Sequence, residues 1–305
     1  MEIRKLNYRV GWLVADYLNT SPCAITPALM AELLPEGCDA AAEEVIYRAL
    51  LGGFLGLDAE KSEEDRFIDE RYLAPGLRRL DPARWRANPY YRTIRIEAAR
   101  HGNWELAWQA YQPYELFLRD DLILTGDLRQ IPAIGYFAES FRYPSVLQEG
   151  REWMSIKPSE IESSQAAVDA AFGRVVTFGL GLGYFAFMAA RKPEVSSITV
   201  VERDPAVIAL FRESVLPQIP EKDKITVIQS DAFDYLEYRM SPSGVDFVFM
   251  DIWHDIADGT ALYVRARQFE SRFPRTRFTY WADRSLKCAL VDELQRQGHY
   301  FLPGE

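Results

Sequence analysis

Short apolar runs recur along the second half of the chain and alternate with segments of helical periodicity. The runs lie at 175–178, 197–202, 225–229, 245–251 and 277–281. They are rich in valine, isoleucine and phenylalanine, as buried strands are. The helix-like segments between them lie at 206–215, 233–239, 260–271 and 285–297. Strands that alternate with helices favour an α/β fold with a Rossmann-like parallel sheet and helices on both faces.

A glycine-rich turn follows the first apolar run, and acidic residues follow the later ones. Gly179, Gly181 and Gly183 alternate with leucines and lead into a helix-like segment. Glycines let a backbone approach a ligand closely, and a helix N-terminus offers unpaired N–H groups. The acids at the ends of the later runs are Glu202, Asp231, Asp251 and Asp283. Because ligands bind at the carboxyl ends of parallel strands, the sequence predicts a binding site there.

About the last 135–145 residues of the chain, which contain these glycines and acids, resemble the class I S-adenosylmethionine-dependent methyltransferases. The resemblance implies that the three glycines lie beside the amino-acid and sugar parts of bound S-adenosylmethionine. It also implies that Glu202 holds the ribose hydroxyls, that Asp231 and Ala232 bind the adenine, and that Asp251 faces the methionine end or the substrate. The chain departs from the family at Thr177, where an acid is usual. Only 300–302 offers one of the family's last strands, so a shortened sheet is expected.

The resemblance implies methyl transfer to a small molecule, which it does not identify. Candidate catalytic residues follow the fourth run, namely Asp251, His254 and Asp255. A base is needed only if the acceptor loses a proton during attack, and histidine titrates near neutral pH. A loop histidine without a role fits the pattern too, and Asp231 and Asp251 also fit the pattern of residues that cap the helices after them. Arg284 follows Asp283 where metal-dependent O-methyltransferases have an amide ligand, so no metal site is expected.

Three other interpretations fit parts of the pattern. A nicotinamide-dependent enzyme accounts for the glycine turn and Glu202, but not for Asp231 and Asp251. A spermidine synthase-like aminopropyltransferase is favoured by the arrangement of a β element, an acid-rich segment and a helix before the turn. That family, however, has an aspartate inside its turn. A non-catalytic cofactor-binding module stays open because no acceptor motif is intact. We favour the methyltransferase.

The first half of the chain has a different pattern. Helical periodicity covers 6–18, 27–34, 41–55 and 93–111. Extended runs at 145–148 and 151–155 flank Glu149-Gly150, as in a hairpin, and Ser159-x-x-Glu162 matches a capping box. The sequence therefore predicts a mainly helical domain at 1–115, a β connecting region at 116–158, and a Rossmann-like S-adenosylmethionine-binding domain at 159–305.

Composition limits the partners and the compartment. A chain of 305 residues, 48% of them hydrophobic, is large enough for two domains with cores. Its net charge of -10 argues against a nucleic-acid partner, whereas a small-molecule substrate is expected. The apolar run at 10–15 is too short to span a membrane. Cys23, Cys38 and Cys288 have no disulfide or metal spacing, which favours a reducing, cytoplasmic location. The oligomeric state stays open.

Overall fold

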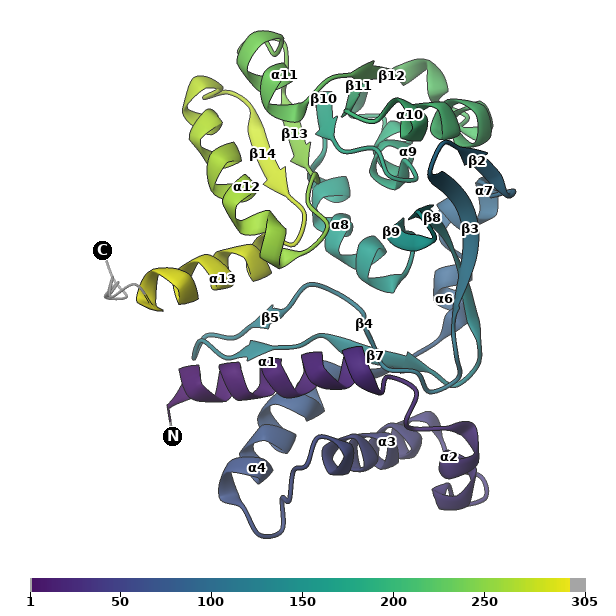
Figure 1. Cartoon of the computed structure of the whole chain (residues 1–305), viewed down its shortest axis with the longest axis vertical. Helices are drawn as coiled ribbons and strands as arrows, with labels where there is room; N and C mark the ends of the chain where they lie inside the picture. Colours follow the sequence, from purple (N-terminus) through teal and green to yellow (C-terminus); the bar gives the residue numbers. More distant parts are fainter. Residues whose placement is uncertain (1, 297–305) are drawn as a thin grey trace. The chain divides into compact units, whose positions relative to one another are not determined.

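A computed structural model describes residues 2–296 (Figure 1). The chain forms two units, neither of which is continuous in sequence. One comprises 1–85 and 110–142, and the other 86–109 and 143–305. We call them the N-terminal and C-terminal units. Their bounds differ from the three predicted ranges because strands from 99–111 and 141–155 form one sheet. The candidate strand at 300–302 lies outside the described residues.

A five-stranded parallel sheet forms the centre of the C-terminal unit. Its strand order is β12-β11-β10-β13-β14, and every neighbouring pair is parallel. The strands are β10 (Gly173–Phe178), β11 (Val195–Glu202), β12 (Ile225–Gln229), β13 (Phe247–Met250) and β14 (Arg277–Tyr280). The earliest strand is central, and the chain proceeds from it toward both edges. The parallel sheet predicted from the five apolar runs is therefore confirmed.

Helices of the C-terminal unit pack on both faces of this sheet. They are α8 (Pro158–Ala170), α9 (Tyr184–Ala190), α10 (Pro205–Leu210), α11 (Ala232–Tyr238), α12 (Ile256–Phe269) and α13 (Asp283–Arg296). On one face, Phe178 belongs to a buried cluster with Leu236 of α11 and Tyr263 of α12. On the other, Phe185 of α9 stacks on Phe249 with ring centroids 4.4 Å apart. This alternation follows from the two-residue period of a strand.

Most of a second sheet of four strands lies in the same unit. Its order is β2-β3-β8-β9, formed by β2 (Ala99–His101), β3 (Trp104–Tyr111), β8 (Phe141–Gln148) and β9 (Arg151–Ser155). The predicted hairpin is confirmed, since β8 and β9 pair antiparallel around Glu149-Gly150. The helix predicted at 93–111 is wrong. Trp104 and Leu106 are buried while Glu105 between them is not, so the two-residue period of a strand prevails there.

The helix predicted after the hairpin exists, but its start differs from the prediction. Lys157 is the N-cap of α8 and Pro158 occupies its first turn, without a side-chain capping bond. Ser159 and Glu162 therefore lie inside the helix and form no capping box. Proline suits the first helical position because its fixed φ is helical and it lacks the N–H that would go unpaired.

The N-terminal unit joins helices to short strands. Its helices are α1 (Ile3–Thr20), α2 (Pro27–Leu33), α3 (Ala40–Phe54), α4 (Glu63–Ile68) and α5 (Ala74–Gly76). Its strands are β1 (Leu77–Leu80), β4 (Phe117–Leu118), β5 (Ile123–Leu124), β6 (Gln130–Ile131) and β7 (Ile134–Phe137). Tyr47 of α3 stacks on Tyr136 of β7 with centroids 3.8 Å apart. The helices predicted at 6–18, 27–34 and 41–55 are confirmed.

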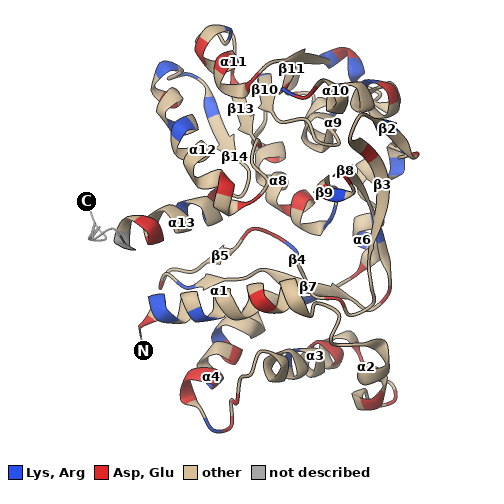
Figure 2. Cartoon of the chain, in the orientation of Figure 1, with Lys and Arg blue, Asp and Glu red and all other residues tan. Residues whose placement is uncertain are grey.

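Shorter helical elements complete the described chain. They are η1 (Asp69–Leu73), α6 (Pro82–Arg86), α7 (Pro89–Thr93), η2 (Phe211–Val215), η3 (Leu216–Gln218), η4 (Lys222–Lys224) and η5 (Glu270–Arg272). Acidic and basic residues are interspersed over both units (Figure 2). Within residues 2–296, no helix combines the length and the apolar character needed to cross a membrane.

Candidate functional site

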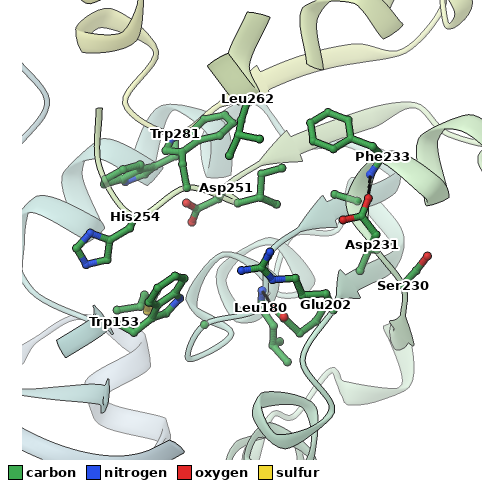
Figure 3. Close-up of a pocket in the computed structure, with 18 of the residues that line it drawn as sticks. Trp153, Leu180, Glu202, Ser230, Asp231, Phe233, Asp251, His254, Leu262 and Trp281 are labelled. Carbon is green, nitrogen blue, oxygen red and sulfur yellow. Dashed lines mark hydrogen bonds between the residues drawn. The ribbon is translucent and has the colours of Figure 1, made fainter. Parts of the chain in front are cut away.

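A cavity of about 230 Å³ lies in the C-terminal unit, where the parallel strands end (Figure 3). Among the residues predicted for the site, its wall includes Gly179, Gly181, Glu202, Asp231, Ala232, Asp251 and His254. A hollow of about 80 Å³ adjoins it and shares Gly181, Glu202 and Trp153 with it. Gly183 and Asp255, which were also predicted, are not part of either wall. The structure thus brings together side chains from separate strand ends, as expected for a parallel sheet.

Glu202 ends β11 and is held by two backbone N–H groups. Its Oε2 accepts a hydrogen bond of 3.1 Å from Leu180 N, and its Oε1 accepts one of 2.9 Å from Asp204 N. Burial raises the pKa of Glu202, and these N–H groups oppose the rise. Each carboxylate oxygen can accept more than one bond, so both remain able to accept from a ligand hydroxyl. Glu202 thereby connects the glycine turn, the start of α10 and the cavity.

Asp231 caps the helix that follows β12. Its Oδ1 accepts the N–H groups of Phe233 at 2.8 Å and Asp234 at 3.2 Å. Its Oδ2 makes no hydrogen bond with any described residue, and Asp231 lines the cavity. The capping role that the sequence pattern left open is therefore present. The second oxygen stays available to a donor from a ligand.

The glycine turn is close-packed against the protein itself. Gly179 has a φ of +91°, and a Cβ there would lie 1.9 Å from the carbonyl oxygen of Asp251. A Cβ on Gly181 would lie 2.8 Å from the Met154 sulfur, and one on Gly183 would lie 2.2 Å from the Phe211 ring. Before any ligand is considered, an added side chain would therefore clash with a backbone oxygen at Gly179 and with an aromatic ring at Gly183, whereas at Gly181 it would meet a flexible methionine. Gly183 therefore acts by letting α9 pack beside η2.

Two carboxyl groups that make no hydrogen bond or ion pair with a described residue line the cavity from different elements. Asp251 follows β13 and Glu160 lies in the first turn of α8; both line the cavity. Figure 3 shows the Asp251 carboxyl directed into the space between His254 and Trp153. Burial raises the pKa of Asp251 well above its usual range, and the charge of Glu160 adds to the rise. Burial likewise raises the pKa of Glu160 to about 7. Each ionised carboxylate of the pair therefore disfavours ionisation of the other.

His254 and Asp255, both predicted to be catalytic, have different surroundings. His254 is exposed, lines the cavity, and has its ring centroid 5.4 Å from that of Trp153. Asp255 is the N-cap of α12: its Oδ1 accepts the N–H of Ala257 at 2.7 Å, and Asp258 completes a capping box. The His254 Nδ1 lies 3.6 Å from an Asp255 carboxylate oxygen. Asp255 therefore stabilises the helix and is not part of the cavity wall.

We expect Asp255→Ala to lower the free energy of unfolding by about 1 kcal/mol, the usual cost of losing a helix cap. Urea denaturation measures this change. Asp255→Ser keeps a capping oxygen and should retain most of the stability. Neither variant should change ligand binding in the cavity by more than about twofold, since Asp255 does not line it. A large loss of ligand affinity in a stable Asp255→Ser protein would show that Asp255 takes part in binding after all.

The sequence did not indicate several of the residues that line the cavity. They are Trp153, Met154, Glu160, Arg203, Arg265 and Trp281. Trp153 and Met154 belong to the β8–β9 hairpin, whose sequence gives no sign that it meets the glycine turn. The Arg203 guanidinium makes no hydrogen bond or ion pair with any described residue. Its place directly after the strand-end Glu202 is a signal that was available in the sequence. Among residues 2–296, no three potential metal ligands come together.

Comparison with known proteins gives only partial likenesses. No protein-family model matches the chain, and no curated protein does. One similar solved structure is a protein named as an O-methyltransferase from Klebsiella pneumoniae, with 19% identity over 38% of this chain and 49% of that one (TM-score 0.28). Another is the spermidine synthase of Thermotoga maritima, with 12% identity over 55% and 51% of the two chains (TM-score 0.32). The chain spans about half the length of each.

Proposed function

We propose that the C-terminal unit binds S-adenosylmethionine in this cavity and that the protein transfers its methyl group to a small molecule. The observation that carries the proposal is the convergence of Glu202, Asp231 and Asp251 on one cavity beside the glycine turn. These acids come from the ends of three parallel strands.

The residues present fit the charges and donors of this cofactor. Glu202 would accept the two ribose hydroxyls, and Asp231 Oδ2 would accept from the adenine amino group. Asp251 would face the cationic end, and the unpaired Arg203 guanidinium offers a partner for a carboxylate. The bound sulfonium supplies a methyl group that is already activated. The chain therefore has to align the acceptor and exclude water, for which Trp153 and Trp281 provide apolar walls.

Aminopropyl transfer is the second candidate, and the unpaired carboxyls of Asp251 and Glu160 favour it specifically. Such a pair would suit a donor that lacks a carboxylate and an acceptor that carries several amines. The glycine turn disfavours aminopropyl transfer, because Leu180 and Leu182 place no negative charge between the glycines. The two reactions are separated by which cofactor the cavity prefers.

A thermal-shift panel tests the cofactor class. S-adenosylmethionine and its demethylated product should each raise the melting temperature, since a ligand that binds only the folded state stabilises it by mass action. Stabilisation by NAD alone would contradict the proposal. An absence of shift with every nucleoside cofactor, confirmed by calorimetry, would leave a module that does not bind cofactor.

We further expect S-adenosylmethionine to bind more tightly than its decarboxylated form, by about tenfold. One charge-assisted hydrogen bond to the carboxylate, from Arg203 or from an N–H of the turn, is sufficient for that difference. Competition binding with both compounds measures it. Arg203→Gln should reduce the preference if the guanidinium is the partner. A clear preference for the decarboxylated compound would instead establish aminopropyl transfer as the better assignment.

A further inference from the structure

We infer that the methyl acceptor is a primary or secondary amine that enters as a cation and is held between Asp251, Glu160 and the ring of Trp153. The inference rests on the proposed function and names the acceptor class for the same cavity. It makes Glu160 a residue of the site, although it precedes the glycine turn and no sequence pattern indicated it.

The first ground is that two acids line the same cavity. Asp251 follows β13 and Glu160 lies in α8, so the fold brings them together from distant parts of the sequence. Neither makes a hydrogen bond or an ion pair with any described residue. Lys157, the nearest ammonium in sequence, is occupied, because its Nζ lies 2.6 Å from Glu152 Oε1. Half-buried carboxyls without such a partner are partly desolvated, and a cationic ligand would offset that cost.

The second ground is the aromatic wall beside these acids. Trp153 keeps 39% of its surface exposed, and its ring lies beside that of His254 in the cavity wall (Figure 3). Trp281 is fixed by a hydrogen bond of 2.8 Å from its Nε1 to Ser163 Oγ. Trp253 is only 5% exposed, lines the cavity, and has an Nε1 without a partner among the described residues. Tryptophan faces attract ammonium groups, which adds to the attraction of the acids.

The charged groups around Glu160 define how it responds to pH. Burial raises its pKa, Lys157 and His254 oppose the rise, and Glu152 adds to it. The resulting value is about 7. Asp251 also faces Glu160 and has a raised pKa. A bound cation favours the ionised pair, so amine binding should release protons. Affinity should fall as the pH is lowered from 8 to 6, where Glu160 takes up a proton.

The pair also meets a chemical requirement of an amine acceptor. An ammonium has no lone pair, so its nitrogen must lose a proton before it can attack. A carboxylate of the pair accepts that proton. The neutral nitrogen then bonds to the methyl carbon as the carbon–sulfur bond breaks, and the electron pair of that bond passes to sulfur. The positive charge moves from sulfur to nitrogen, and no further reactant is required.

The test is calorimetric titration of the whole chain with benzylamine and with benzyl alcohol as its neutral counterpart. The cofactor site is first filled with the demethylated cofactor product, so that no turnover occurs. We expect benzylamine to bind at least tenfold more tightly than the alcohol at pH 8. Titrations in buffers of different ionisation enthalpy should reveal proton release near pH 7. Glu160→Gln and Asp251→Asn should each remove most of the preference for the amine, and Glu160→Gln should flatten its pH dependence.

Glu194→Gln is the matched control, since Glu194 is exposed and outside the cavity. Equal binding of amine and alcohol, or an unchanged preference in folded Glu160→Gln protein, would overturn the inference. The inference would also be overturned if Glu160→Gln weakened only the binding of the demethylated cofactor product. That result would assign Glu160 to the cofactor's own amino group. If no cofactor binds, the proposed function fails, and the same titrations without it still test the preference for a cation.

Discussion

Replacing Glu202 with alanine should weaken the binding of S-adenosylmethionine by about tenfold to a hundredfold. Each charge-assisted hydrogen bond to the ribose contributes on the order of 1.5–3 kcal/mol. The substitution also removes the acceptor of the Leu180 and Asp204 N–H groups. The glycine turn would then lose its tie to the start of α10. Calorimetry on the folded variant measures the loss.

Glu202→Gln separates these two contributions. Its amide oxygen can still accept one of the two backbone N–H groups, while its NH₂ group cannot accept any. We therefore expect an intermediate affinity and a melting temperature closer to that of the parent. Glu194→Ala, at a position that is not part of the cavity wall, should leave the affinity unchanged. If Glu202→Ala bound the cofactor as tightly as the parent, Glu202 would be a structural residue only.

Gly179→Ala should lower the free energy of unfolding by about 4 kcal/mol or more, which is exceptional for the addition of one methyl group. The new Cβ would lie 1.9 Å from the carbonyl oxygen of Asp251, a backbone atom that cannot rotate away. The positive φ of +91° adds conformational strain. Because Gly179 touches the residue that bears a site carboxyl, any adjustment would also displace Asp251. Denaturation in urea, followed by circular dichroism, measures the change.

Gly102→Ala provides the matched control for strain alone. Gly102 also has a positive φ, +59°, but a Cβ there meets nothing within 4 Å. Gly102→Ala should lower the free energy of unfolding by only about 1–2 kcal/mol, which is the cost of the left-handed conformation. Similar losses for the two variants would show that the tight contact between Gly179 and Asp251 is absent from the protein.

The sheet was readable from the sequence because each parallel strand is buried on both faces. Such strands are continuous apolar runs, and turns or acids mark their ends, as at Gly179 and Asp251. The segment at 93–111 was misread because Trp104 and Tyr111 are seven residues apart, a helical spacing, whereas Trp104 and Leu106 are two apart, a strand spacing. Packing in the second sheet decides between them, and a single sequence does not contain that information.

For a related reason, only some of the residues that line the cavity could be predicted from the sequence. Residues at strand ends share one edge by topology, so Glu202, Asp231 and Asp251 could be grouped from their spacing. Glu160 and Trp153 reach the cavity from α8 and from the hairpin, through tertiary packing that no local pattern encodes. The sequence likewise does not show that Glu160 makes no hydrogen bond or ion pair with a described residue, since Lys157 is its nearest apparent partner. The structure gives that lysine to Glu152.

The strand order bears on how the protein folds. Every pair in the five-stranded sheet needs a crossover connection, and the hydrogen bond between Arg174 of β10 and Asp246, which directly precedes β13, spans 72 residues of sequence. The β8–β9 hairpin, by contrast, closes through Glu149-Gly150. Local contacts form quickly, whereas distant ones wait on loop closure. The hairpin with Trp153 should therefore be native-like early during refolding. The capacity to bind a ligand should arise last, when β13 docks and brings Asp251 into place.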